Sequence, residues 1–230
     1  MLLHGLREQV LEANLELVRR GLVLYTFGNA SGIDREQGLI AIKPSGVEYE
    51  KLKAADLVIT GLDGRVVEGS LRPSSDLPTH LVLYQSFPTI GGVAHTHSEY
   101  ATAWAQARRP VPCFGTTHAD SFHGPVPVTE AMNKQEIESA YEENTGRAIV
   151  QAFGDTDPMA IPAVLVANHG PFTWGPDAVV AAQNAVILEA VARVAYFTVA
   201  INHDATPIAG ALHDKHFLRK HGANAYYGQS

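Results

Sequence analysis

The sequence is poor in cysteine and in charge. Cys113 is the single cysteine among 230 residues, so no disulfide can form within the chain and a cysteine-based zinc site is excluded. Charged side chains make up 18% of the residues, and 17 basic against 24 acidic ones give a formal net charge of −7. Because the phosphate backbone of a nucleic acid attracts a basic surface, this balance argues against a nucleic-acid partner. It does not exclude an anionic small molecule, which a few local N–H groups and one cation can hold.

The sequence also shows neither a recognisable signal peptide nor an uninterrupted apolar segment typical of a membrane span. The first residues have no basic stretch followed by an apolar one, so they do not read as a signal peptide. The longest apolar segment, 178–201, carries Gln183, Asn184, Glu189 and Arg193 near its middle, and charges there would be costly in lipid. We therefore expect a core helix rather than a membrane span. With the lone cysteine, this favours a cytoplasmic protein without a membrane partner.

Apolar periodicity predicts helices and strands that alternate along the whole chain. The alternation indicates one domain of the α/β or α+β class. Asp63-Gly64 between two short strands predicts a hairpin, so the sheet is not all parallel. Strands are expected at 23–27, 39–43, 57–60, 65–67, 92–96 and 163–167; helices at 6–20, 76–86, 98–107, 133–153, 178–201 and 212–220; and a loop at 110–128.

Histidine is abundant instead, with 11 residues. His95 and His97 fall at positions i and i+2 at the end of a predicted strand, so their imidazoles are expected to point the same way. His169 follows another strand, and Asp76 stands at a predicted helix start. Such ligands suit Zn²⁺, with Mn²⁺ or Co²⁺ as alternatives. Half-buried strands also carry such pairs without metal, and Asp76 could be an N-cap, so spacing alone leaves both interpretations open. For His118, His123, His216 and His221, a surface or hydrogen-bonded role is more usual than metal binding.

Three turns of small residues follow predicted strands or precede a helix. They are Gly28-Asn29-Ala30-Ser31-Gly32, Pro44-Ser45-Gly46 and Pro73-Ser74-Ser75, and Lys43 adjoins the second. Turns of this kind present N–H groups and hydroxyls that together could cradle a phosphate, with Lys43 as the cation. Neither the P-loop nor the dinucleotide fingerprint is matched. Each turn taken alone is also compatible with an ordinary loop, where Gly, Ser and Pro are common.

Together, these motifs resemble the class II aldolase/epimerase family over nearly the whole chain. The resemblance rests on 28–31, 42–47, 73–80 with its Pro-Ser-Ser-Asp run, 91–98 with His-Thr-His, and 169–172. Thr116-Thr117-His118-Ala119-Asp120, the stretch 214–223 and the tail Tyr226-Tyr227-Gly228-Gln229 are most similar to the family's ketopentose-phosphate 4-epimerases. Ala30 and Asn168 depart from the usual Val and Ser, without removing a functional atom that we can name.

The resemblance implies a fold, a cofactor and an assembly. The fold is a single α/β domain over 1–230 with a central, mainly antiparallel mixed sheet flanked by helices. The cofactor is a catalytic Zn²⁺ held by His95, His97 and His169 with Asp76 at or beside it. The assembly is a homotetramer with its active sites between subunits. Sugar-phosphate contacts are implied for Gly28, Asn29, Lys43, Ser45, Gly46, Ser74 and Ser75, with His216 in support.

The resemblance also implies a reaction: L-ribulose 5-phosphate becomes D-xylulose 5-phosphate by zinc-assisted retro-aldol cleavage, rotation of glycolaldehyde phosphate and re-addition. Arabinose and ascorbate breakdown both use this substrate. Proton transfer falls to Asp120 and to Tyr227, the latter from a neighbouring subunit. From the residues alone, Asp120 could instead cap a loop and Tyr227 could anchor the C-terminus.

Three alternatives remain at this point. A sugar-phosphate aldolase of the same family, such as an L-fuculose-phosphate aldolase, would release the fragments, but such enzymes usually carry Glu where this chain has Asp76. A domain in which zinc only stabilises the fold is a second alternative, although three ligands with an open position favour catalysis. A non-haem iron oxygenase with two His and one carboxylate is the third.

Overall fold

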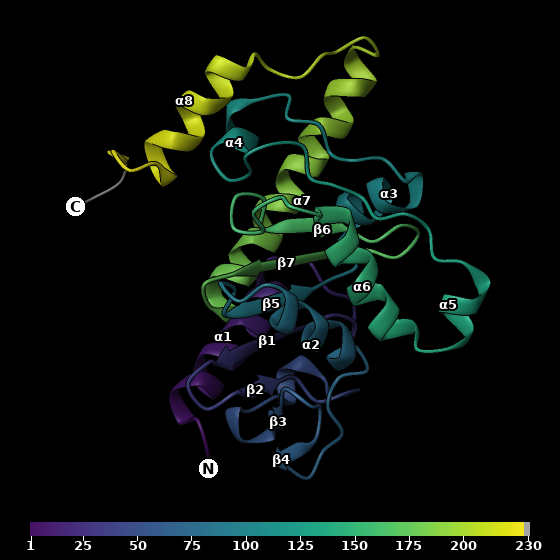
Figure 1. Cartoon of the computed structure of the whole chain (residues 1–230), viewed down its shortest axis with the longest axis vertical. Helices are drawn as coiled ribbons and strands as arrows, with labels where there is room; N and C mark the ends of the chain where they lie inside the picture. Colours follow the sequence, from purple (N-terminus) through teal and green to yellow (C-terminus); the bar gives the residue numbers. More distant parts are fainter. Residues whose placement is uncertain (228–230) are drawn as a thin grey trace.

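The computed structural model describes residues 1–227, so Gly228 and Gln229 of the tail motif lie outside it. At its centre is a seven-stranded sheet in the order β4-β3-β2-β1-β5-β7-β6 (Figure 1). Neighbouring strands in the described chain pair antiparallel, and one isolated bridge, between Val128 and Leu165, is parallel. The predicted α/β fold with a mainly antiparallel sheet flanked by helices is thereby confirmed. The strands are β1 (Asn29–Asp34), β2 (Leu39–Ile42), β3 (Val58–Gly61), β4 (Val66–Glu68), β5 (Gly92–His95), β6 (Ala163–Leu165) and β7 (Pro171–Gly175).

Helices cover both faces of this sheet. They are α1 (His4–Arg19), α2 (Leu77–Ser86), α3 (Glu99–Ala107), α4 (Thr116–Ala119), α5 (Lys134–Glu138), α6 (Tyr141–Phe153), α7 (Ala178–Ile201) and α8 (Gly210–His221), with short 3-10 turns at Tyr49–Lys51 and Ala54–Asp56. Ile40 and Val93 belong to the apolar core beneath α2 and α6, whereas their neighbours Ala41 and Ala94 pack beneath α1 and α7. Because successive side chains of a strand point to opposite faces, short apolar strands can line two cores at once.

The predicted strand at 23–27 was wrong. The chain turns there, because the Phe27 N–H donates to the Leu24 carbonyl at 2.9 Å and Tyr25 has a left-handed φ of 53°. The side chain of Tyr25 is 90% exposed, so it packs on neither face of the sheet. Strand β1 was not predicted; it begins at Asn29 and occupies most of the predicted small-residue turn at 28–32.

The predicted helix at 133–153 is two helices. The backbone leaves the helical region at Ser139, whose ψ is −98°, between α5 and α6. The Asn144 side chain holds this break, because its Nδ2 donates to the Glu136 carbonyl at 2.8 Å and to the Ser139 hydroxyl at 3.2 Å. No glycine or proline marks the break in the sequence.

Strand β7 was not predicted. It is five residues long, is fully buried and begins at Pro171, where a strand tolerates the missing N–H. Because Gly-Pro pairs flank it on both sides, its sequence resembles a loop. It pairs with β5, with His95 opposite Phe172, and so forms one wall of the site described below. The predicted loop at 110–128 also contains a short helix, α4.

Helix α7 is long and apolar enough, by length and composition alone, to cross a membrane. One side of it packs instead against β5, β7, α1 and α3. Its central polar residues have partners: Asn184 Nδ2 donates to the Trp174 carbonyl at 2.7 Å. The Glu189 carboxylate accepts the N–H groups of Tyr100 and Ala101, in the first turn of α3, at 2.8 and 2.9 Å. This packing supports the interpretation as a core helix.

Candidate active site

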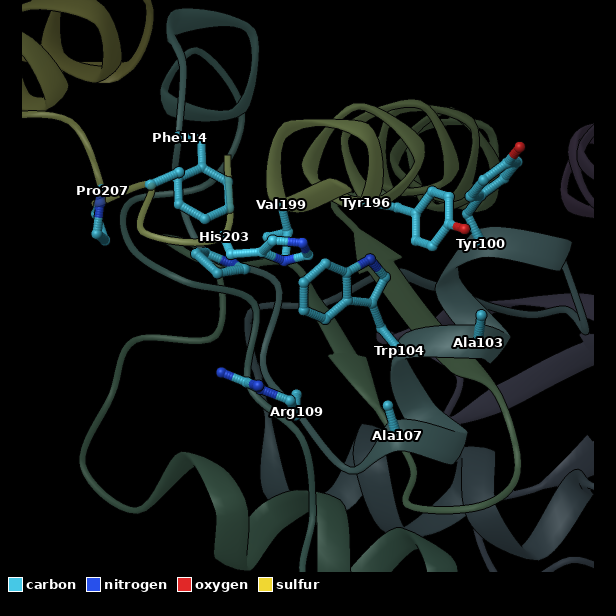
Figure 2. Close-up of a pocket in the computed structure, with 12 residues that line it drawn as sticks. Tyr100, Ala103, Trp104, Ala107, Arg109, Phe114, Tyr196, Val199, His203 and Pro207 are labelled. Carbon is cyan, nitrogen blue, oxygen red and sulfur yellow. The ribbon is translucent and has the colours of Figure 1, made fainter. Parts of the chain in front are cut away.

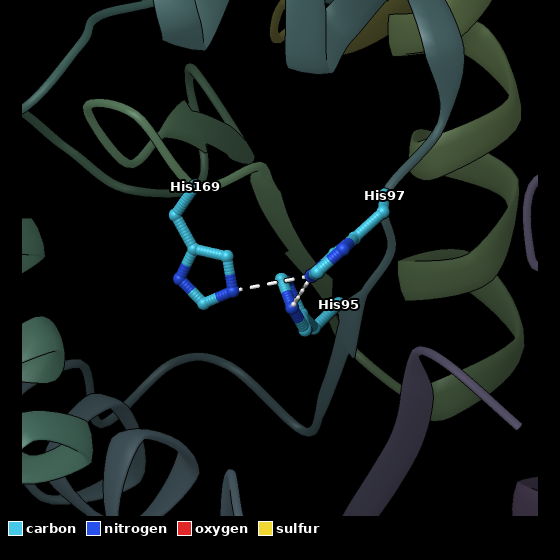
Figure 3. A group of neighbouring side chains, drawn as sticks. All are labelled: His95, His97 and His169. Carbon is cyan, nitrogen blue, oxygen red and sulfur yellow. Dashed lines mark hydrogen bonds between the residues drawn. The ribbon is translucent and has the colours of Figure 1, made fainter.

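Three histidines meet where β5 and β7 end. His95 is the last residue of β5, His97 lies two residues beyond it, and His169 lies in the turn between β6 and β7. The Nε2 atom of His97 is 3.1 Å from that of His95 and 3.2 Å from that of His169 (Figure 3). The three rings are mutually close to perpendicular, with interplanar angles of 72° to 88°. The nitrogens therefore converge from three directions on one point.

Contacts of its Nδ1 atom and of its ring face hold the His95 ring in place. Its Nδ1–H donates to the Pro171 carbonyl at 2.9 Å, and the ring stacks on Phe172 with centroids 4.1 Å apart. Burial lowers the pKa of His95 to about 3, so the ring is neutral and its Nε2 carries a lone pair. His169 has a comparable support, because its Nδ1 lies 3.3 Å from the Tyr141 hydroxyl. Burial also lowers the pKa values of His97 and His169.

This donor set fits a divalent metal ion. Zn–N bonds of about 2.0–2.1 Å place two tetrahedral nitrogen ligands about 3.4 Å apart, close to the 3.1 and 3.2 Å seen here. Three neutral imidazoles that turn their nitrogens inward repel one another unless a cation or a proton lies between them. Supporting bonds to the outer nitrogens, as His95 and His169 make, are typical of metal-bound histidines. A three-ligand centre leaves a coordination position for substrate.

Two glycines let the segments around His95 approach this closely. A Cβ on Gly170 would lie 2.7 Å from the Thr96 carbonyl oxygen, and one on Gly28 would lie 2.8 Å from the His95 carbonyl oxygen. Both are closer than real Cβ atoms come. Asn168, just before His169, has a left-handed φ of 62°, which Asn adopts more readily than most residues. The unusual Asn noted in the sequence therefore suits the turn that presents His169.

Asp76 lies beside the histidines but outside their cluster of ligand atoms. It occupies the N-cap position of α2 without a side-chain capping bond; instead, its carboxylate accepts Asn29 Nδ2 at 2.6 Å. Asn29 in turn pairs with His95 across β1 and β5. Burial acts to raise the pKa of Asp76, but His95, His80 and the Asn29 hydrogen bond outweigh it and leave that pKa below its ordinary value. The ordinary N-cap role is thus absent, and a carboxylate faces the histidines.

His80 is a buried neighbour of Asp76 that was not among the predicted site residues. Its Nδ1 lies 2.7 Å from the Ser31 hydroxyl, which lies 2.7 Å from the Tyr84 hydroxyl, while its Nε2 is buried without a hydrogen-bond partner among the described residues. Burial lowers the pKa of His80 to about 4, against the opposing effect of Asp76. The available signal was the spacing Asp76–His80, since residues i and i+4 share a helix face.

Of the three predicted small-residue turns, the first was wrong, because Asn29–Asp34 forms strand β1; the other two follow β2 and precede α2. The Ser45 N–H donates to the Arg72 carbonyl at 2.9 Å and the Ser74 N–H to the Lys43 carbonyl at 3.0 Å, so the second and third turns lie side by side. The Tyr49 hydroxyl, at the end of the second, donates to the Gly28 carbonyl at 2.8 Å. Since these two N–H groups are already bonded, a phosphate would be met there by hydroxyls and by the other N–H groups of the turns. Ser45, Gly46 and Ser75 are exposed, and Ser74 is buried.

Lys43 is a buried cation between these turns. Its ammonium lies 4.6 Å from the centre of the Tyr49 ring and 3.4 Å from the Pro44 carbonyl oxygen, and its side chain makes no ion pair within the described chain. Burial lowers the pKa of Lys43 to about 8. An anion bound at the turns would supply the missing charge partner.

Asp120, directly after α4, and Tyr227, after α8, form a second group. Arg219 donates to both Asp120 carboxylate oxygens at 2.9 Å, and His216 Nδ1 lies 3.0 Å from one of them. Burial acts to raise the pKa of Asp120, but these partners and Lys220 outweigh it and leave that pKa below its ordinary value, so the carboxylate stays ionised. The Tyr227 ring lies beside the same cations, 4.8 Å from Arg219 Cζ. Arg219 was missed in the sequence, although it lies within the quoted stretch 214–223.

This second group lies at the end of the molecule where α4 and α8 extend beyond the sheet (Figure 1). The histidines lie at the ends of β5 and β7 in its middle. A separate apolar cavity of about 530 Å³ opens between α3 and the end of α7, lined by Trp104, Tyr196, Phe114 and Arg109 among others (Figure 2). None of the predicted site residues lines it.

Comparison with known proteins defines the class. Residues 8–196 match the model of the class II aldolase and adducin N-terminal domain, and the chain belongs to that family. A solved L-fuculose 1-phosphate aldolase is 27% identical with a TM-score of 0.78, over 92% of this chain and 94% of that one. The L-fuculose-1-phosphate aldolase of Thermus thermophilus, 22% identical with a TM-score of 0.70 over 88% of this chain and 98% of that one, shares the fold.

Within this class, the chain is similar to proteins named L-ribulose-5-phosphate 4-epimerase UlaF. Those of Salmonella paratyphi A and Salmonella typhi are each 54% identical to it over 224 residues, which cover 97% of this chain and 98% of theirs. The family resemblance drawn from the motifs is thereby confirmed.

Proposed function

We propose that this chain is a metal-dependent L-ribulose-5-phosphate 4-epimerase. The observation that carries the proposal is the convergence of three neutral histidine nitrogens near two small-residue turns and a buried lysine that has no ion-pair partner among residues 1–227. The first feature suits a divalent ion, with zinc as our choice and Mn²⁺ or Co²⁺ as substitutes, and the second suits a phosphate. The similarity to named 4-epimerases selects the substrate.

The reaction must break a carbon–carbon bond. The hydrogen on C4 of a 2-ketopentose phosphate is not adjacent to the carbonyl, so direct deprotonation there is unfavourable. Removal of the C4 hydroxyl proton with cleavage of C3–C4 gives glycolaldehyde phosphate and the enediolate of dihydroxyacetone. If the aldehyde turns its other face before the bond forms again, its new hydroxyl takes up a proton with inverted configuration. A divalent ion held by His95, His97 and His169 would act as a Lewis acid toward the enediolate charge.

Other residues of the chain hold the phosphate and position Asp76. Lys43 and the hydroxyls of Ser45, Ser74 and Ser75 hold the phosphate, so the aldehyde stays tethered while it rotates. Gly28 and Gly46 leave room at the turns. Asn29 holds Asp76 beside the histidines through its 2.6 Å hydrogen bond. The ionised Asp76 adds negative charge that favours a bound cation.

Asp120 and Tyr227 carry the protons in this proposal, and both come from one subunit. They share the cations of α8, and α8 packs on α4 at the end of the molecule away from the histidines. The two residues therefore reach the histidines of a neighbouring subunit together, as a unit. This extends the expectation from the sequence, in which only Tyr227 came from a neighbouring subunit. The ionised Asp120 accepts the proton, and the Tyr227 phenol supplies one on the other face.

A homotetramer with its sites between subunits follows from this division. Its support is apolar surface on the last turns of α7, where Tyr196 is 52% and Ile201 is 86% exposed. Contiguous apolar surface of this kind commonly marks a protein interface. We also propose a cytoplasmic location, in keeping with the lone, unpaired Cys113.

Complementation between subunits tests this arrangement. Asp120→Asn/Tyr227→Phe and His97→Ala proteins should each convert little L-ribulose 5-phosphate. Mixed tetramers, refolded from both, should regain activity because some sites combine intact histidines with an intact neighbour. Control mixtures of either variant with itself should stay inactive. Failure of the mixed tetramers to regain activity, although mixing is verified by mass, would contradict the shared site.

The second candidate is a sugar-phosphate aldolase, favoured by the structural similarity to an L-fuculose 1-phosphate aldolase. The two candidates differ in what leaves the site. The epimerase retains glycolaldehyde phosphate and returns a five-carbon product, whereas an aldolase releases two fragments. Dihydroxyacetone phosphate released from L-fuculose 1-phosphate, without formation of D-xylulose 5-phosphate from L-ribulose 5-phosphate, would establish the aldolase.

A further inference from the structure

A second cluster of metal-binding side chains lies outside the proposed active site. His123 follows α4, and His213 and Asp214 lie in the first turns of α8. One ligand atom from each of the three lies within 4.8 Å of the others. None of these residues has a role in the proposed epimerase reaction. Taken singly in the sequence, His123 resembled an ordinary surface residue, and only the fold brings it to the other two.

The spacing of the ligand atoms and one supporting hydrogen bond favour metal coordination. His123 Nε2 lies 3.0 Å from Asp214 Oδ1, and His213 Nδ1 lies 3.9 Å from the same oxygen. His213 Nε2–H donates to the Phe122 carbonyl at 3.1 Å, so in the neutral ring Nδ1 carries the lone pair. This bond to a backbone carbonyl is the support that a metal-bound imidazole usually has on its outer nitrogen. The distances bracket the spacing of about 3.4 Å between tetrahedral ligands of zinc.

The ring of His123 is held between two residues of α8. It stacks on His213 at 4.9 Å with an angle of 13°, and on Phe217 at 4.4 Å with an angle of 24°. Its backbone N–H is bonded to the Ala160 carbonyl at 2.8 Å, which anchors this part of the chain to the body of the protein. His123 and Asp214 are exposed and His213 is partly buried, so an ion can enter and water can complete its coordination.

We infer that His123, His213 and Asp214 form a second divalent-metal site, which takes Zn²⁺ or another late first-row ion through two imidazoles and one carboxylate. An ion there joins α8 to the segment after α4 (Figure 1). It therefore restrains the helix that precedes Tyr227 and carries the partners of Asp120. The site is independent of the proposed reaction, since none of its ligands belongs to the His95 cluster.

Metal counting on the full-length protein tests this inference. Protein stripped with a chelator is incubated with excess Zn²⁺, desalted and measured by plasma mass spectrometry. We expect two zinc ions per chain in the parent and one in His123→Phe, which preserves the aromatic stack, and in Asp214→Asn. His203→Phe, an exposed histidine outside both clusters, is the matched control and should keep two. One zinc in the parent, or two in both cluster variants, would overturn the inference.

A triple variant, His95→Ala/His97→Ala/His169→Ala, separates this site from the active site. It should keep one zinc per chain, which is then lost on adding Asp214→Asn. A triple variant that binds no zinc refutes the second site, whatever becomes of the proposed function. Zinc should also slow amide hydrogen exchange in α8 of the parent and the triple variant but not of Asp214→Asn. Equal exchange with and without zinc in the parent would contradict a bound ion that joins α8 to the body.

Discussion

The lysine at the phosphate turns makes the protein less stable at neutral pH than a neutral residue of the same shape would. Lys43 is 1% exposed, and burial lowers its pKa from 10.5 to about 8. We predict that Lys43→Met, which keeps the length of the side chain, raises the free energy of unfolding at pH 7 while it weakens binding of the substrate phosphate.

The magnitude follows from the two pKa values. The gap between 10.5 and about 8 corresponds to about 3 kcal/mol, the cost of keeping the ammonium charged in its buried place. Loss of the contacts with the Tyr49 ring and the Pro44 carbonyl returns about 1 kcal/mol. The variant should therefore be more stable than the parent by about 2 kcal/mol at pH 7.

The same two pKa values determine how the stability difference between the parent and Lys43→Met changes with pH. Below pH 8, Lys43 is protonated in both the folded and the unfolded state, so the cost is fully present. Between pH 8 and 10.5 the folded protein loses the proton first, the unfolded chain binds more protons, and the stability of the parent rises with pH relative to the variant. The advantage of Lys43→Met should shrink across this window. Substrate phosphate should conversely bind the parent less tightly above pH 8, because it needs the charged lysine.

Chemical denaturation of both proteins from pH 7 to 10, at one fixed protein concentration, measures the difference. A Lys43→Met protein that is no more stable at pH 7, or a difference that stays constant up to pH 10, would refute the reasoning. Lys53→Met is the matched control, because Lys53 is exposed, and it should change stability little at any pH.

Three further predictions concern other residues. Gly170→Ala should lose most bound active-site metal and activity, since its Cβ would lie 2.7 Å from the Thr96 carbonyl oxygen; unchanged metal content would show that the turn can move freely. Glu189→Gln should lower the free energy of unfolding by about 1–2 kcal/mol, since it weakens two charge-assisted bonds to the N-terminus of α3; denaturation equal to the parent would contradict that capping role. Arg219→Met should raise the pKa of Asp120 toward its ordinary value, as followed by carboxyl NMR, and should lower kcat; an unmoved titration would mean that the ion pair is not formed in solution.

Regular periodicity predicted most of the helices and five of the seven strands in the described chain, but not β1 or β7. Helices at 76–86, 98–107 and 178–201 and a hairpin at Asp63-Gly64 correspond to α2, α3, α7 and the β3–β4 pair. These elements have long apolar stretches, an apolar face or strong turn residues, which are local properties of the chain. Strand β7 and the break at Ser139 depend on distant partners: β7 is ordered by its pairing with β5 and β6, and the break by the Asn144 side chain.

The candidate site was predictable in its parts rather than in its arrangement. His95, His97 and His169 carry a recognisable spacing, and the structure adds the 3.1 and 3.2 Å separations of their nitrogens. The partners of these groups could not be read from the sequence, since Pro171, Tyr141 and Arg219 come from elements far away along the chain. The separation between the Asp120 group and the histidines could not be predicted from the sequence either, because it depends on the position of α8 relative to the sheet.

The central claim is that a divalent ion at His95, His97 and His169 is needed for epimerisation at C4. The most direct measurement follows L-ribulose 5-phosphate by NMR with protein that has been stripped of metal and then given one equivalent of Zn²⁺ per active site. The account predicts a folded but inactive stripped protein, and D-xylulose 5-phosphate as the product after zinc is restored. Full epimerase activity in the stripped protein, or zinc-dependent release of two fragments without D-xylulose 5-phosphate, would contradict it.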